Sequence, residues 1–247
     1  MFNFKTTILK YRDFVINNFY SFEDLCFIYT NTSLNALPKS TKKIILISGI
    51  REYYFLLVVK IIIKFYTKKN FLFICINPYI FNHKAIQKGL YKKIKRKIAL
   101  FIDYIFARIK WNGLYASVGI DHTVQFDEKN LNPKELKNIE GICKNFLKNI
   151  KKKEDVLNLK IDGILYGEVL YDTYLRFGHS PTLDISDEYF KKLLFELIAS
   201  HTNLTKYIRK NKYKIHSYYC MYTSYLHFGI PALCLVKNKI SCYAITD

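Results

Sequence analysis

Three charged side chains at helical spacing stand in the stretch of the chain that is richest in glycine. Glu168, Asp172 and Arg176 follow one another at intervals of four residues, so a helix would carry all three on one face. A carboxylate held there can take the proton of a hydroxyl group as a general base, which makes Asp172 and Glu168 the candidate catalytic residues. The alternative is structural, because Asp172 and Arg176 are also spaced for a salt bridge within the helix.

The residues around this triplet predict a short loop followed by a helix. Apolar residues recur at three and four positions between 169 and 177, and we expect Gly178 to end the helix in the left-handed conformation. Gly163 and Gly167 would let a backbone pass close to a ligand or a neighbouring segment. The candidate substrate-binding residues come from this stretch and from a tyrosine-rich turn near the C-terminus: Gly167, Tyr171, Arg176, His179, Tyr222 and Tyr225.

These candidates also have ordinary structural interpretations. Tyrosines of the turn can stack on the apolar faces of sugar rings, but tyrosines beside a buried strand more commonly pack in a core. His179 follows a glycine in a loop, where it can meet a phosphate or a sugar hydroxyl or can simply be solvated. Both interpretations stay open for each residue.

No metal site and no cofactor are predicted. The six cysteines form no C-x-x-C pair, and His201, His216 and His227 have no metal-ligand spacing to cysteines or acids. The sequence contains neither the G-x-G-x-x-G fingerprint of dinucleotide-binding proteins nor the G-x-x-x-x-G-K-[ST] of P-loops. We interpret the cysteines as buried thiols in a reducing cytoplasm, and the three histidines as core or surface residues.

The elements that must position these residues alternate between strands and helices. Short apolar runs at 42–50 and 70–78 flank an apolar helix at 51–66, which predicts a βαβ unit with parallel strands. A third strand is expected at 122–126, and a second βαβ unit at 212–247. Two further helices are expected, one from Pro133 to about Lys151 capped by Asn132, and one capped by Ser186.

This alternation predicts an α/β fold with an open, mostly parallel, Rossmann-like sheet covered by helices on both faces. We expect one domain over residues 1–247 with a basic helical insertion at about 83–110. Ligands of such folds bind at the carboxyl ends of the strands. The turns at 48–52, 77–79 and 220–225 should therefore converge at one edge.

The net charge of +19 indicates attraction to polyanions, although a solvated lysine-rich surface explains it equally well. The helix at 83–110 could lie on an anionic membrane or pack on the core. No RNA- or DNA-binding motif occurs, so nucleic acid is not an expected partner. The most apolar window, from Glu52 to Tyr66, is interrupted by Lys60 and Lys64 and predicts a buried helix. Without a secretory signal pattern, we expect a cytoplasmic protein with peripheral contact to the inner face of the membrane.

Four segments in order resemble the N-terminal half of bacterial surface-polysaccharide glycosyltransferases, the capsule and lipopolysaccharide biosynthesis proteins of the two-Rossmann-domain (GT-B) type. They are "LYASVGID" at 114–121, "GILYGEVLYDTYLRF" at 163–177, "SPTLDISDEYF" at 180–190 and "YTSYLHFGIPALCLVKNKISCYAI" at 222–245. The resemblance implies transfer of a sugar from a nucleotide-activated donor to a glycan acceptor. It also implies that this half binds the acceptor and that a second domain or subunit binds the donor. Together with the high glycine density, it leads us to expect that Gly167, Tyr171, Asp172 and Arg176 border the same cleft as Tyr222.

The last turn departs from the pattern of that family. Met221 and Tyr222 stand where a Ser-His pair is expected, and Leu233 stands where an arginine usually follows G-I-P-A. A histidine- or arginine-based role at this turn is therefore not expected. Two alternatives to a transferase remain: a non-catalytic Rossmann-like scaffold that binds a partner transferase, and a basic nucleic-acid-binding protein.

Overall fold

A five-stranded parallel sheet forms the centre of the molecule in the computed structural model, which describes residues 42–49, 53–66, 70–76, 115, 118–178 and 181–244. The strand order is β3-β2-β1-β6-β7, and every neighbouring pair is parallel. The strands are β1 (Lys43–Ser48), β2 (Phe71–Ile76), β3 (His122–Val124), β6 (Ile215–Cys220) and β7 (Ser241–Ala244). The predicted α/β, Rossmann-like fold is confirmed, as are both βαβ units.

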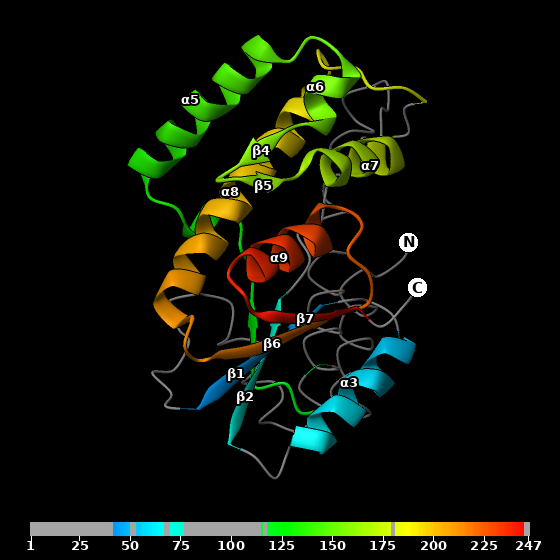
Figure 1. Cartoon of the computed structure of the whole chain (residues 1–247), viewed down its shortest axis with the longest axis vertical. Coiled ribbons are helices and arrows are strands. Elements are labelled where there is room, and N and C mark those ends of the chain that lie inside the picture. The colour runs from blue at the N-terminus through cyan, green and yellow to red at the C-terminus, as the bar shows by residue number, and fades with distance from the viewer. Residues whose placement is uncertain are drawn as a thin grey trace, which may run out of the picture.

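Helices cover the sheet and extend beyond it (Figure 1). The long helix α8 runs from the outer helices down to the sheet, where the chain enters β6 (Figure 1). The remaining described elements, in chain order, are α3 (Tyr53–Tyr66), η2 (Glu128–Asn130), α5 (Pro133–Asn149), α6 (Lys153–Leu157), β4 (Lys160–Ile161), β5 (Ile164–Leu165), α7 (Gly167–Gly178), α8 (Glu188–Asn211) and α9 (Leu226–Lys237).

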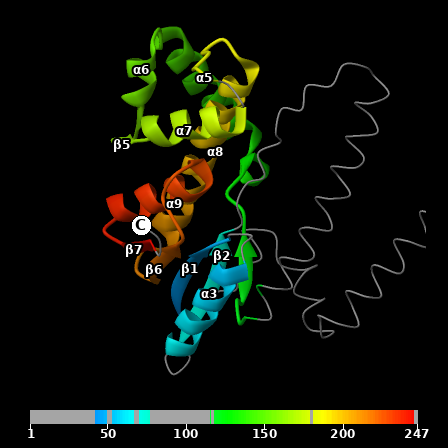
Figure 2. The same ribbon diagram turned by 90° about the vertical axis from the view of Figure 1, so that its right-hand side faces the viewer.

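The two faces of the sheet belong to different hydrophobic cores. Alternate residues of β1 point to opposite faces: Ile44 and Leu46 join the core formed with α5, α7, α8 and α9, whereas Ile45 and Ile47 pack with α3. Strands buried on both faces must be apolar throughout, which is why β1 and β2 read as continuous apolar runs. Figure 2 shows α3 and α9 lying apart on the two sides of the strands.

The strand order reverses at β1, and this fixes where a ligand crevice should lie. The chain proceeds from β1 to β2 and β3 on one side, then returns through the helices to place β6 on the other side of β1. The carboxyl ends of β1 and β6 lie at one edge, because Ile47 pairs with Tyr219 in parallel register. Convergence of these two strand ends is confirmed, whereas the turn at 77–79 and the basic segment at 83–110 lie outside the described residues.

Local capping agrees with the sequence at α5 and differs at α7 and α8. Asn132 forms a full capping box with Glu135, and α5 ends two residues before the expected Lys151. Asp187, not Ser186, caps α8, because both the amide and the hydroxyl of Ser186 donate to Asp184 Oδ1. The prediction of a left-handed Gly178 is wrong: it is the last residue of α7, and its φ lies outside the left-handed range.

The hairpin β4–β5 and the helix α6 were not anticipated from the sequence. Asp162 and Gly163 form the hairpin turn with φ of 51° and 74°, the pair of positive values that a type I′ turn requires. Asp162 also accepts a bond from His201 on α8, with 3.1 Å between Oδ2 and Nε2. The turn is thereby tied to the core.

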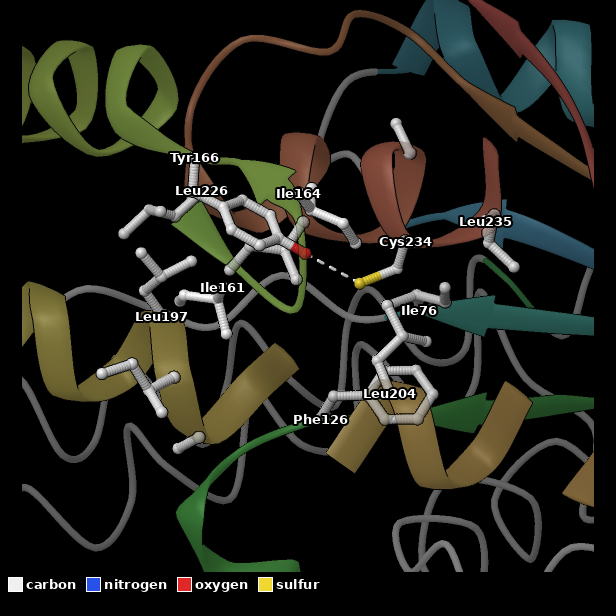
Figure 3. Packing of buried hydrophobic residues seen from close by; sticks show 14 of the residues in the cluster. Ile76, Phe126, Ile161, Ile164, Tyr166, Leu197, Leu204, Leu226, Cys234 and Leu235 are labelled. Atoms are coloured by element: carbon white, nitrogen blue, oxygen red, sulfur yellow. Dashed lines mark hydrogen bonds between the residues drawn. The ribbon is translucent and has the colours of Figure 1, made fainter. Parts of the chain in front are cut away.

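A buried polar chain continues from that histidine into the core, and Figure 3 shows its last link, between Tyr166 and Cys234. The hydroxyl of Tyr166 lies 2.9 Å from His201 Nδ1 and 2.8 Å from Cys234 Sγ on α9. His201 is therefore a hydrogen-bonded core histidine. Burial raises the pKa of the Cys234 thiol to about 11, which keeps the thiol protonated. The described cysteines are all free thiols: Cys75, Cys143, Cys220, Cys234 and Cys242.

Candidate functional site

An open depression lies beside the turn that follows β6. Its volume is about 440 Å³, and it is lined by Asp172, Leu175 and Arg176 of α7 and by Ser224 and Tyr225 of the turn. Segments about 50 residues apart in the sequence therefore meet here. The turn begins at the carboxyl end of β6, next to the point where the strand order reverses, which is where ligands of open α/β sheets bind.

A buried threonine holds α7 against α9 at this place. Thr173 Oγ1 accepts a hydrogen bond from the Leu226 amide at 2.8 Å and donates one to the Val169 carbonyl at 2.7 Å. The first helical residue of α9 would otherwise bury an unpaired amide, which is costly. A Cβ on Gly229 would lie 2.7 Å from the Thr223 carbonyl oxygen, so this close approach of helix and turn requires glycine. The two walls of the depression are thus fixed relative to each other.

Tyr225 adopts a strained backbone conformation in the wall of the depression. Its φ of 64° and ψ of 152° fall in a region that only glycine occupies readily, at a cost of about 1–3 kcal/mol. The ring stacks on His227, with 6.2 Å between centroids, and meets the edge of Phe177 at 5.4 Å. Strain of this kind persists where surrounding contacts impose it, and it is concentrated at functional sites.

Asp172 and Arg176 present two separate charged groups to the depression. Both side chains are exposed, and within the described part of the chain no ion pair joins them. The predicted alternative of a salt bridge along α7 is not what the structure contains. A carboxylate that can accept a hydroxyl proton and a guanidinium that can bind an anion are therefore both directed at the solvent of the depression.

Four of the other predicted residues are placed elsewhere. Gly167 is buried where a Cβ would lie 2.0 Å from the Leu157 carbonyl oxygen, so its close approach is to a backbone and not to a ligand. Lys153 Nζ lies over the ring of Tyr171, 4.5 Å from the ring centroid. Glu168 is exposed and does not line the depression, and Tyr222 packs edge-on against Phe228 at 4.6 Å. Of the residues predicted to share one cleft, Gly167, Tyr171 and Tyr222 therefore do not line the depression, whereas Asp172 and Arg176 do. His179 lies outside the described residues.

A second, smaller hollow lies on the other side of the same turn. It has a volume of about 30 Å³ and is lined by residues of the β2 and β3 ends, of α8 and of the first turns of α9: Ile76, Gln125, Phe126, Glu196, Ser200, Leu204, Leu226, His227, Ile230 and Pro231. Burial raises the pKa of the Glu196 carboxyl to about 7 and lowers that of the His227 imidazole to about 4. The stacked rings of Tyr225 and His227 stand between the two hollows.

Two residues of this region were missed from the sequence. Thr173 belongs to the predicted helix stripe and to the segment at 163–177 that resembles the family, but no role was predicted for its hydroxyl, although a buried threonine hydroxyl must find partners. Glu196 carried a detectable signal, because it interrupts the buried face of α8 formed by Leu193, Leu197 and Leu204. A carboxylate in such a stripe either pairs or has its pKa raised.

Comparison with protein-family models, with curated proteins and with solved structures found no significant match to this chain. Among the described residues, no group of His, Cys, Asp and Glu is arranged to hold a metal ion. No helix in the described part of the chain is both long and apolar enough to span a bilayer. The case for a function therefore depends on the depression and on the sequence resemblance.

Proposed function

We propose that this chain is the acceptor-binding part of a glycosyltransferase that transfers a sugar from a nucleotide-activated donor during assembly of a bacterial surface polysaccharide. One observation carries the proposal: Asp172 and Arg176 come from one of the resembling segments, Tyr225 from another, and all three line one open depression. These segments are far apart in the chain, and their meeting in one depression supports the expectation, drawn from the resemblance, that they border one cleft.

The residues of the depression suit a polyhydroxylated acceptor. In the proposed reaction, Asp172 takes the proton of an acceptor hydroxyl, whose oxygen bonds to the anomeric carbon of the donor while the bond to the nucleotide phosphate breaks. Arg176 would hold a phosphate or a sugar hydroxyl at the rim. The exposed side of Tyr225 would pack on a sugar ring. Tyr222 contributes by supporting the turn through Phe228.

The donor and the cellular location belong to the same proposal. The nucleotide-sugar would be bound largely by a second transferase domain or subunit, with the depression facing it. The protein would act in the cytoplasm, in peripheral contact with the anionic inner face of the membrane, where its positive charge of +19 is attracted to acidic lipids.

Replacing Asp172 by Asn in the cell of origin tests the proposal. The variant should lower surface polysaccharide synthesis by on the order of 10² to 10⁴, because proton transfer is lost. Its melting temperature should stay unchanged, because the side chain is exposed and belongs to no ion pair among the described residues. Glu140→Gln on α5 is the matched control, an exposed carboxylate far from the depression in sequence and on another helix.

The outcome separates the proposal from its main alternative. A stable Asp172→Asn protein that supports normal polysaccharide synthesis would refute a catalytic role for this residue. If deletion of the gene abolishes the polysaccharide while Asp172→Asn and Arg176→Gln both preserve it, the chain acts as a scaffold for a partner transferase.

A further inference from the structure

The small hollow beside Glu196 contains a carboxyl group whose surroundings do not satisfy it. Glu196 is only 7% exposed, and within the described part of the chain its carboxyl oxygens have no well-formed hydrogen bond, the nearest donor being Lys192 Nζ at 3.4 Å from Oε1. Buried carboxyl oxygens without partners are rare, because each loses its bonds to water on folding. The group lines the hollow, so a ligand or water entering it would supply the missing donor.

The charge around Glu196 decides which kind of donor fits. Lys192 Nζ lies 3.4 Å from Oε1, so an ammonium group already balances the carboxylate when it is ionised. Tyr189 lies near Glu196 on the same helix, α8. From other elements, Glu128 of η2 adds negative charge, and half-buried His227 of α9 faces the same hollow. A second cation would be repelled by Lys192, and an anion would be repelled by Glu196 and Glu128.

The size and lining of the hollow further limit which chemical group can bind in it. A volume of about 30 Å³ holds one or two atoms of water size, and most of the lining is aliphatic or aromatic. A single –CH₂OH or –CHOH group would meet both requirements, because its carbon would face the apolar lining, which includes Leu204 and Ile230, and its hydroxyl would face the carboxyl of Glu196.

We propose that the hollow between α8 and the first turns of α9 is a binding site for one uncharged hydroxyl group of a small ligand, which donates a hydrogen bond to Glu196. The assignment is independent of sugar transfer, because it concerns only what the hollow can hold. The stacked rings of Tyr225 and His227 separate this hollow from the depression at Asp172. One polyhydroxylated ligand could therefore reach both hollows around the turn.

Three one-carbon probes test the proposal on the full chain: methanol as the neutral hydroxyl, methylammonium as the cation and formate as the anion. The protein is labelled with ¹³C at the glutamate carboxyl, and the Glu196 resonance is identified by its loss in Glu196→Gln. Exposed Glu188 on the same helix provides the internal reference. Methanol should shift the Glu196 resonance saturably, with Kd no tighter than on the order of 10 mM because the probe is so small. The Glu188 resonance should follow only the linear change of the solvent.

A second variant closes the hollow without touching the carboxyl. Ser200 lies one turn after Glu196 and lines the same space, so Ser200→Leu should weaken saturable methanol binding at least tenfold while the Glu196 resonance remains. Methylammonium and formate should bind at least tenfold more weakly than methanol in the unmodified protein. Equal linear shifts at Glu196 and Glu188, or tighter binding of either ion, would overturn the assignment. Sugar transfer by the chain without a methanol shift would reject this site and leave the transferase proposal intact.

Discussion

Replacing Glu196 by Gln should make the stability of the protein less dependent on pH. The carboxyl pKa rises from 4.5 to about 7 on folding because burial disfavours the ionised form. Between these two values the folded state binds the proton more tightly, so ionisation of Glu196 destabilises the fold progressively as pH rises. One unit of pKa shift corresponds to about 1.36 kcal/mol, so ionised Glu196 lowers the free energy of unfolding by about 3 kcal/mol above pH 7. Below pH 4.5 this loss of stability is absent.

The experiment is urea unfolding of both proteins from about pH 4.5 to 8.5. The difference in free energy of unfolding, Gln variant minus parent, should increase by about 3 kcal/mol across this range and level off above pH 7. His227, whose pKa falls from 6.5 to about 4 on folding, adds a rise in stability with pH between these two values, but it is present in both proteins and cancels in the difference. Glu188→Gln, which removes an exposed carboxylate paired with Lys191, should change stability by at most about 1 kcal/mol at every pH.

A difference that stays constant over the whole range, or that decreases with pH, would refute the reasoning. The first result would mean that Glu196 is solvated or paired well enough to keep an ordinary pKa. The second would mean that the ion pair with Lys192 dominates over burial. Either result would also remove the main reason for treating the hollow as short of a hydrogen-bond donor.

Two further predictions concern the contacts that hold α7 in place. Thr173→Val should lower the free energy of unfolding by about 1–3 kcal/mol, because the buried amide of Leu226 loses its acceptor. Thr173→Ser keeps a hydroxyl and should retain most of the stability. Equal losses for the two variants in urea unfolding would contradict this role of Thr173. Gly167→Ala places a methyl 2.0 Å from the Leu157 carbonyl oxygen, so it should prevent folding or cost more than about 3 kcal/mol. Gly141→Ala, in open space on α5, should instead raise stability by about 0.5–1 kcal/mol, and similar melting temperatures for the two alanine variants would contradict the packing argument.

The parallel sheet was predictable because the pattern that specifies it is local. Strands buried on both faces must be apolar at every position, and β1 and β2 show this within six residues each. The cap of α5 was equally predictable, since Asn132 and Glu135 satisfy each other within one turn. The Asp-Gly pair at 162–163 is the local signal of a type I′ hairpin turn, whereas we predicted Gly163 only to let a backbone pass close to a ligand or a neighbouring segment.

The sequence by itself determined the strands, the main helices and the edge of the sheet at which a site should lie, because hydrogen bonding and the burial of alternate faces depend on neighbours in the chain. Only the tertiary structure decided which side chains meet at that edge. Asp172 and Arg176 join Tyr225 because α7 packs on α9 through Thr173 and Gly229, contacts between residues about 50 positions apart. The same packing directs Gly167 toward a carbonyl group and buries Glu196 beside a hollow, since the surroundings of a side chain are set by distant segments that no local pattern contains.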